Sequence, residues 1–223
     1  MLTIHPLYLD NHLLVVCKPA GILIQSDITG DLSLLEAARH YLKETFDKPG
    51  NVFLGMVHRL DRPVSGVVVF AKTSKAASRL SDQFRKKTVE KKYWALVEGK
   101  PPKSGVLSNR IVREGVNSRI TNETIGKEAD LSFRRILYSN NTSLIEIVLG
   151  TGRHHQIRVQ LAHIGFPIIG DFRYGSKVKF PNRALALHAR SVTINHPVRG
   201  KRMIFVAPLD TIWPEEVKNI QTG

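Results

Sequence analysis

The chain has 223 residues, one cysteine and a formal net charge of +14, with 33 Lys and Arg against 19 Asp and Glu. Its length is enough to bury a sizeable core, and no apolar segment approaches the length of a membrane span. A disulfide within the chain is excluded because Cys17 has no second cysteine to pair with. We therefore expect a single domain over residues 1–223 in a reducing, cytoplasmic compartment.

Hydrophobic periodicity and turn residues predict the first elements. The run 13–18 is apolar and ends at a Pro-Ala-Gly turn, which is typical of a strand. Ser33 and Glu36 have the spacing of a capping box, which predicts a helix from Ser33 to about Phe46. Further along, the pattern predicts a strand over 67–71, a helix over 74–87 and a strand over 91–98.

The second half of the chain is predicted to be mainly strands. Residues 101–127 are rich in Gly, Ser, Asn and Arg with weak periodicity, and we interpret them as short strands and loops inserted over one face. Strands outnumber helices and few alternate as βαβ units, so we expect an α+β fold with a mixed, mainly antiparallel sheet core flanked by helices. The remaining predicted elements are an antiparallel pair over 131–138 and 144–149 with a turn at 139–141, a helix over 155–164, and strands over 184–194 and 203–206.

The excess of positive charge favours a polyanionic partner, of which nucleic acid is the commonest, over a basic surface that is merely solvated. The clusters Arg85-Lys86-Lys87 and Lys91-Lys92 are candidates for phosphate contacts. Charge at the end of the predicted helix would equally well offset the helix dipole. Lys18, ahead of a glycine turn, is either a phosphate contact or a plain surface lysine.

The tetrad His58-Arg59-Leu60-Asp61 precedes Ser65-Gly66 and the apolar run 67–70. A carboxylate at the mouth of a buried strand can be held ionised by a nearby guanidinium and aimed at a ligand, as a nucleophile or base must be. A surface Arg and Asp ahead of a strand would have the same sequence. The tetrad alone does not distinguish these interpretations.

Three further blocks accompany the tetrad along the chain. They are Lys18-Pro19-Ala20-Gly21, the alternating Lys91-x-Tyr93-x-Ala95-x-Val97-x-Gly99, and Gly152-Arg153-His154-His155-Gln156-Ile157-Arg158, which leads into Leu161-Ala162-His163-Ile164-Gly165 and Gly170-Asp171. In this order the four blocks resemble the RluA-type pseudouridine synthase family. The resemblance spans roughly residues 10–208, which is nearly the whole chain.

The resemblance implies a pseudouridine synthase catalytic fold and an enzyme that isomerises uridine in RNA, replacing the N1–C1′ glycosidic bond by a C5–C1′ bond. It implies no external cofactor and no metal. Asp61 takes the position of the catalytic carboxylate, which either attacks the sugar or base or removes a ribose proton; both roles stay open. Arg158 matches the family arginine that pairs with this aspartate, and Arg153 is the second choice.

Other positions are implied to bind the substrate. Tyr93 matches the family tyrosine that lies against the target base, where its hydroxyl can take part in loss of the C5 proton. Ile157 would pack on the other side of that base. The uridine must be turned out of its stack, and Arg59 matches the arginine that fills the vacated space. His58 and Lys18 complete the expected substrate-binding set.

The chain departs from the family pattern at three places. Val64 stands where Thr is usual, Cys17 where Asn is frequent, and His154 where Thr or Ser is usual. None of these changes removes a catalytic group. The first block begins near residue 10, so we expect no amino-terminal accessory RNA-binding domain.

Two other functions compete with an isomerase. An RNA-binding or RNA-folding protein on the same fold would have no need of the intact catalytic positions. A metalloenzyme would use His154, His155 and His163, although adjacent histidines would point about 100° apart on a helix. The RNA substrate, ribosomal or transfer, is left open, and we expect a monomer without an obligatory protein partner or membrane attachment.

Overall fold

The computed structural model describes residues 2–26, 30–47 and 49–220. Their contacts divide the chain into two compact units, one of residues 1–89 and 189–208 and one of residues 90–188 and 209–223. The single domain expected over 1–223 stays a prediction.

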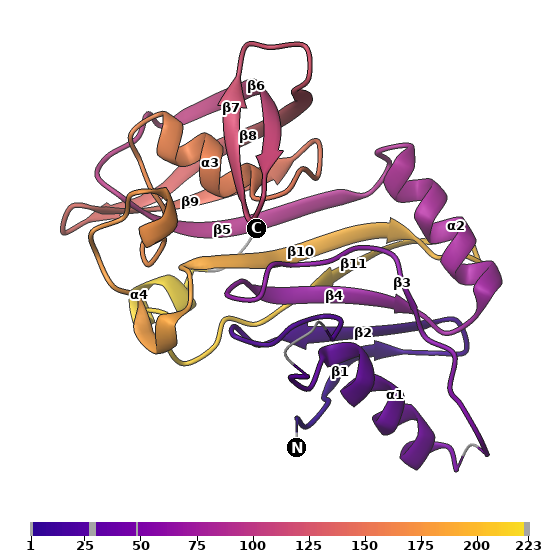
Figure 1. The fold of residues 1–223 in the computed structure, drawn as a ribbon. Helices are drawn as coiled ribbons and strands as arrows, with labels where there is room; N and C mark the ends of the chain where they lie inside the picture. The colour runs from indigo at the N-terminus through magenta and orange to yellow at the C-terminus, as the bar shows by residue number, and fades with distance from the viewer. Residues whose placement is uncertain (1, 27–29, 48, 221–223) are drawn as a thin grey trace. The chain divides into compact units, whose positions relative to one another are not determined.

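The first unit is built on a sheet (Figure 1), and its strand β4 (Ser65–Ala71) is buried on both faces. Every residue of β4 is buried, which explains why the sequence there is a continuous apolar run rather than an alternating one. Cross-strand register pairs Lys18 of β2 with Gly66 of β4. The strands follow the order β1 (Pro6–Leu9), β2 (Leu13–Lys18), β4 (Ser65–Ala71), β10 (Leu187–Asn195), with β3 (Gly55–Met56) on β4 and β11 (Arg202–Val206) on β10.

Two helices belong to this unit, and both begin at capping side chains. Helix α1 (Leu34–Thr45) has the predicted capping box, in which Ser33 and Glu36 satisfy each other's backbone N–H groups. Helix α2 (Ser74–Arg85) begins after Thr73, whose hydroxyl accepts from the N–H of Ala76. It packs against β3 and β4. Both predicted helices are confirmed, as are the strands over 13–18 and 67–71.

The second unit carries a five-stranded antiparallel arrangement. The predicted pair is confirmed as β8 and β9, and the turn between them places Asn140 and Asn141 at φ 47° and 56°. Asparagine tolerates this left-handed conformation, which two-residue hairpin turns require. The order is β5 (Glu90–Glu98), β9 (Thr142–Leu149), β8 (Lys127–Ser139), β6 (Ser104–Glu114), β7 (Asn117–Thr121).

The expectation of short strands and loops over 101–127 is wrong. The segment instead forms the 11-residue strand β6 and its hairpin partner β7. Two of its three glycines serve strand packing: a Cβ on Gly105 would lie 2.7 Å from the Phe133 ring, and one on Gly126 would lie 2.6 Å from Thr121. Because glycine is also the commonest turn residue, the composition suggested loops where the chain needs room between strands.

Helix α3 (Gln156–His163) begins one residue later than predicted, after His155 at φ 53°. Residues 156–161 of this helix are all buried, and the helix contacts β6 and β7.

The sequence prediction did not include β1, β3, the two short 3₁₀ turns Phe172–Tyr174 and Pro181–Arg183, or α4 (Glu215–Lys218). The α+β class with a mainly antiparallel sheet is confirmed. Within the described residues, every helix is too short or too polar to cross a membrane.

Gly66 provides a test of this packing. Its φ is +122°, and an added Cβ would lie 2.4 Å from the carbonyl oxygen of Ala189 on β10. We expect Gly66→Ala to lower the free energy of unfolding by about 2–5 kcal/mol, because backbone strain adds to a backbone clash. Gly21→Ala, at φ +87° with nothing within 4 Å, should cost only about 1–2 kcal/mol. Urea unfolding followed by circular dichroism measures both, and equal losses would contradict the close approach.

Candidate active site

Asp61 lies on a short turn that leads directly into β4. The backbone carbonyl of Asp61 accepts a hydrogen bond from the N–H of Val64 at 3.1 Å, which closes the turn. The Val64 side chain is 2% exposed, so an apolar residue fills the place of the usual threonine without burying an unpaired hydroxyl. The Asp61 side chain is half-buried, while the following Ser65 and Gly66 are buried in the strand. The Asp61 carboxylate therefore projects from a hydrogen-bonded turn that is anchored by the buried residues at the start of β4.

Lys18, at the end of β2, is hydrogen-bonded to the turn that carries Asp61. Its side chain is fully buried, and Nζ donates to the carbonyl oxygens of Pro19, Ile22 and Arg62 at 3.0, 2.7 and 3.0 Å. Burial lowers the pKa of Lys18 to about 7, while the negative charge of Asp61 opposes that shift. The three donors of an ammonium group are matched by three acceptors.

This placement corrects the expectation for Lys18. A fully buried amine is not a surface lysine, and a phosphate would have to displace backbone carbonyls to reach it. The group joins two loops instead, because its three acceptors come from the turn after β2 and from the residue that follows Asp61.

Arg62 strengthens the same connection. Its Nε donates to the carbonyl of Gly21 at 3.0 Å, and the N–H of Gly21 donates back to the Arg62 carbonyl at 2.8 Å. An ion pair of 2.7 Å joins its guanidinium to Asp31. We did not single out Arg62 from the sequence, although its position directly after Asp61 was a usable signal.

His58 and Arg59 have different environments. The Nε2 atom of His58 accepts the backbone N–H of Val69 at 2.9 Å, and its ring stacks on Phe84 of α2 with centroids 5.0 Å apart. Accepting that bond requires an unprotonated Nε2. His58 thus fastens the start of the tetrad to β4, whereas Arg59 is exposed. Substrate binding by either residue stays a prediction.

In the second unit, Tyr93 lies on β5 opposite Ile147 of β9 and is half-buried. Its neighbour Trp94 points to the other face, as strand alternation requires, where Nε1 donates to the Glu146 carboxylate at 3.4 Å. The ring of Tyr93 is therefore partly exposed, next to the buried residues 94–97 of β5. Its contact with the target base stays a prediction.

Arg158 is buried in α3 and forms a two-pronged ion pair with Asp171. Nε and one terminal nitrogen of Arg158 donate to the two carboxylate oxygens at 2.7 and 2.8 Å. The guanidinium also lies over the ring of Tyr174, with its carbon 5.0 Å from the centroid. The planar end of Arg158 is thus fixed on two sides. Pairing with Asp61 stays a prediction.

Asp171 was missed as a site residue, although it belongs to the fourth sequence block. It is 1% exposed, and it follows Gly170 at φ +87°. A Cβ on Gly170 would lie 2.5 Å from the Ala184 carbonyl oxygen, so only glycine brings the chain this close. A Gly-Asp pair after an arginine-bearing helix was the available signal.

Tyr174 connects α3 to the β6–β7 hairpin. Its hydroxyl lies 2.8 Å from Nδ1 of His155 and accepts the backbone N–H of Ser118 at 2.8 Å. The hydroxyl of Ser118 in turn lies 3.0 Å from Nδ1 of His154. Burial, then the charge of Arg158, lowers the pKa of His155 to about 3, so this ring is neutral at physiological pH.

The helical spacing predicted for His154 and His155 is wrong. Both precede α3, and their rings stack with centroids 3.8 Å apart, while His163 is exposed at the far end of the helix. In the described ranges no group of three His, Cys, Asp or Glu side chains is placed to hold a metal ion.

The start of α3 is fixed by Gln156. The side-chain oxygen Oε1 of Gln156 accepts from the Thr151 hydroxyl at 2.7 Å and from the backbone N–H of Arg153 at 3.0 Å. The side-chain nitrogen Nε2 donates to the backbone carbonyl of Asp130. Arg153 is half-buried and donates through Nε to the carbonyl of Glu128 at 2.8 Å. These bonds tie the fourth block to β8. Ile157 is 5% exposed, and its packing on a base stays a prediction.

Comparison with known proteins identifies the family. A family model described as RNA pseudouridylate synthase matches residues 12–163, more than half of the chain. The chain belongs to the RNA pseudouridylate synthase family. The predicted RluA-type family and activity are thereby confirmed: this synthase isomerises uridine in RNA to pseudouridine.

Individual relatives cover almost the whole synthase. It is 37% identical to ribosomal large subunit pseudouridine synthase C of Buchnera aphidicola subsp. Baizongia pistaciae, over 96% of this chain and 70% of that protein. It is 36% identical to synthase D of Zymomonas mobilis, over 90% of this chain and 67% of that protein. The structure of human RNA pseudouridylate synthase domain containing 4 has a TM-score of 0.79 at 24% identity, over 92% of this chain and 88% of that one, which shows the shared fold.

The buried amine of Lys18 makes a pH-dependent contribution to stability. Because its pKa is lowered on folding to about 7, the unfolded synthase binds more protons than the folded one between pH 7 and the ordinary value of 10.5. We therefore expect the free energy of unfolding to rise as the pH rises through this window. Lys18→Met should lack this component, so the difference between wild type and variant in urea unfolding should grow with pH. A constant difference would show that the amine does not titrate in this range.

The Arg158–Asp171 pair can be tested by removing one charge. Asp171→Asn keeps the shape of the side chain but leaves a buried guanidinium without its anion. We expect a loss of about 3–5 kcal/mol in the free energy of unfolding, measured by urea titration. Asp31→Asn removes the partner of the exposed Arg62 and should cost no more than about 1 kcal/mol. A loss at Asp171 as small as at Asp31 would contradict the buried pair.

Proposed function

We propose that this synthase converts uridine to pseudouridine in large-subunit ribosomal RNA. The supporting observation is its similarity to relatives named ribosomal large subunit pseudouridine synthase C or D, with 33–39% identity over 90% or more of the chain. The formal charge of +14 suits a partner with one phosphate per nucleotide. Transfer RNA, the other class left open by the sequence, has no comparable support.

Asp61 is proposed as the catalytic carboxylate. Two features support this role: the side chain is half-buried rather than freely solvated, and its turn is fixed by Val64, Lys18 and Arg62. A carboxylate held in position before substrate binds loses little conformational freedom in reaching the reacting atom. Attack on the sugar or base and removal of a ribose proton are both compatible with this geometry.

Arg158 and Tyr93 are proposed to complete the chemistry. The guanidinium of Arg158 is oriented by Asp171 and Tyr174, so it can present a positive charge without reorganising. Tyr93 offers a ring face for uracil and a hydroxyl for movement of the C5 proton. Ile157 and Arg153 are proposed as neighbouring substrate contacts.

Arg59 is proposed to occupy the space that the target uridine leaves in the RNA. Turning a base out of its stack costs roughly a few kcal/mol, least in a loop or bulge. An exposed guanidinium on the tetrad is free to stack there, because its plane matches that of a base.

We propose a monomer in the cytoplasm that needs no protein partner. The single cysteine supports the location, because a chain without a disulfide suits a reducing compartment.

The decisive experiment is pseudouridine mapping of total RNA from cells lacking this gene, complemented with wild type or variants. We expect one or more uridines of large-subunit ribosomal RNA to be modified with wild type and unmodified with Asp61→Asn, because the amide keeps the shape of the carboxylate but cannot act as nucleophile or base. Asp47→Asn, an exposed change at φ 44° that Asn tolerates, serves as the control and should restore modification.

Two outcomes would overturn parts of this proposal. Modification restored by Asp61→Asn would remove Asp61 from the chemistry while leaving the substrate intact. A modified uridine found only in transfer RNA would overturn the ribosomal assignment while leaving the residue roles intact.

A further inference from the structure

The first unit has an open groove between α2 and the turn that joins β10 to β11. Its volume is about 670 Å³. We call it the α2 groove and define it by its lining residues, Ser78, Arg79, Ser81, Asp82, Gln83, Arg85, Asn195, His196, Pro197 and Gly200. None of these residues belongs to the Asp61 turn or to the four sequence blocks quoted above.

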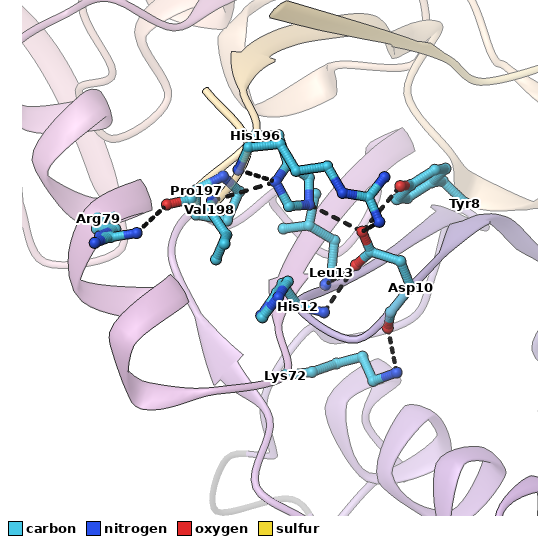
Figure 2. Close-up of polar contacts among 10 residues, drawn as sticks. Tyr8, Asp10, His12, Leu13, Lys72, Arg79, His196, Pro197 and Val198 are labelled. Atoms are coloured by element: carbon cyan, nitrogen blue, oxygen red, sulfur yellow. Dashed lines mark hydrogen bonds and ion pairs between the residues drawn. The ribbon is translucent and has the colours of Figure 1, made fainter. Parts of the chain in front are cut away.

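The two walls of the α2 groove are tied together by side chains of α2. Arg79 donates to the backbone carbonyl of Pro197 at 2.7 Å, as Figure 2 shows. The side-chain amide of Gln83 forms two hydrogen bonds with the backbone of Asn195. It donates to the Asn195 carbonyl and accepts from the Asn195 N–H, at 2.8 Å each. The walls are therefore held at a fixed separation before any ligand binds.

The turn that forms the second wall is itself fixed by His196 (Figure 2). The buried ring accepts the backbone N–H groups of Val198 and Arg199 through Nδ1 at 3.2 and 2.9 Å. The other ring nitrogen, Nε2, must then carry the proton, and it lies 2.9 Å from the carboxylate of Asp10. A turn whose backbone is bound from within by a buried side chain is a rigid wall.

Asp10 remains an anion under this turn. Burial raises the pKa of Asp10, but hydrogen bonds from the N–H groups of His12 and Leu13 and from Tyr8 outweigh burial and bring it to about 2. Its charge is directed inward, at His196 and Arg199 rather than into the groove.

The charged side chains that line the α2 groove have a net positive charge. Arg79 and Arg85 line it, and the same helix and turn region carry further exposed cations. Asp82 is the acidic residue among the lining side chains, and it pairs with both Arg85 and Lys86. Exposed cations that lie within a few residues of the lining along the chain are Lys75, Lys86, Lys87, Arg199, Lys201 and Arg202.

The groove lies well away from the Asp61 turn. Gly66, at the start of β4, approaches Ala189 at the start of the paired part of β10, whereas Asn195 at the other end of β10 lines the groove. Six residues of extended strand separate these ends, which corresponds to about 20 Å. A ligand in the groove is therefore distinct from a uridine at Asp61.

We propose that the α2 groove binds phosphates of the RNA backbone outside the target uridine. This inference rests on the proposed RNA substrate. Guanidinium groups and the hydroxyls of Ser78 and Ser81 are donors suited to phosphate oxygens. Pro197 is the one apolar side chain in the lining, and a protein partner would need the aromatic or aliphatic pockets that dominate protein interfaces.

Binding to a duplex without uridine tests the groove separately from catalysis. The probe is a 20-base-pair duplex of inosine and cytosine, and the readout is its dissociation constant against salt concentration. We expect Arg85→Glu to weaken binding at least about fivefold near physiological salt and to reduce the slope of log affinity against log salt by about 1, because at least one counterion-releasing contact is lost. Arg85 is 79% exposed, so the change places no charge in the core.

Lys43→Glu is the matched control. Lys43 and Arg85 are each the basic residue in the last turn of a 12-residue helix of the same unit, so both changes alter net charge and helix dipole equally. We expect Lys43→Glu to bind the duplex nearly as wild type does.

Three outcomes would overturn the groove proposal. Unchanged binding by Arg85→Glu would exclude the groove as a phosphate site. Equal weakening by Lys43→Glu would show a response to net charge alone. Loss of polyglutamate binding in Arg85→Glu, with duplex binding intact, would assign the groove to an acidic protein instead.

Discussion

The buried ammonium of Lys18 is the interaction on which the Asp61 turn depends. A lysine ammonium is costly to remove from water, and here the cost is partly offset by three backbone carbonyls and the nearby charge of Asp61, while the lowered pKa of Lys18 records the remainder. The carbonyl of Arg62 also accepts the N–H of Gly21, and Lys18 adds a donor to it and to the carbonyls of Pro19 and Ile22, which belong to irregular turns rather than to a sheet. One side chain therefore donates to three backbone groups and joins β2 to the segment that carries the carboxylate.

The second unit uses an arginine in a comparable way. Arg158 is buried, yet both the charge and the orientation of its guanidinium are accounted for by Asp171 and Tyr174. Tyr174 is held in turn by Ser118 of the hairpin and by His155. In both units, then, a buried cation is surrounded by partners that fix its position. For Arg158, whose role in the reaction is proposed, such preorganisation would mean that the protein's dipoles need not rearrange during the reaction.

Much of the fold followed from local sequence signals, and the failures have physical causes. Ser33 with Glu36 placed α1 correctly, because a capping box is a contact between residues three apart. Segment 101–127 was misjudged, since the need for glycine at Gly105 and Gly126 comes from a neighbouring strand and is invisible in local composition. Lys18 was misjudged for a similar reason: its carbonyl partners include Arg62, 44 residues away. Family resemblance supplied the positions of the candidate site residues, but it did not supply the bonds of Arg158, which join side chains from α3 and the following loop.

The pairing of Lys18 with Gly66 sets different tolerances for insertions and deletions along this chain. Side chains alternate between the faces of a strand, so one residue added or lost within β2 would turn Lys18 to the opposite face and leave three carbonyls without this donor. A residue added at the exposed Gly50, in the connection between α1 and β3, would shift neither strand against the other. Changes in chain length should therefore accumulate in such connections, while the spacing from β2 to the glycine turn that follows it stays constant.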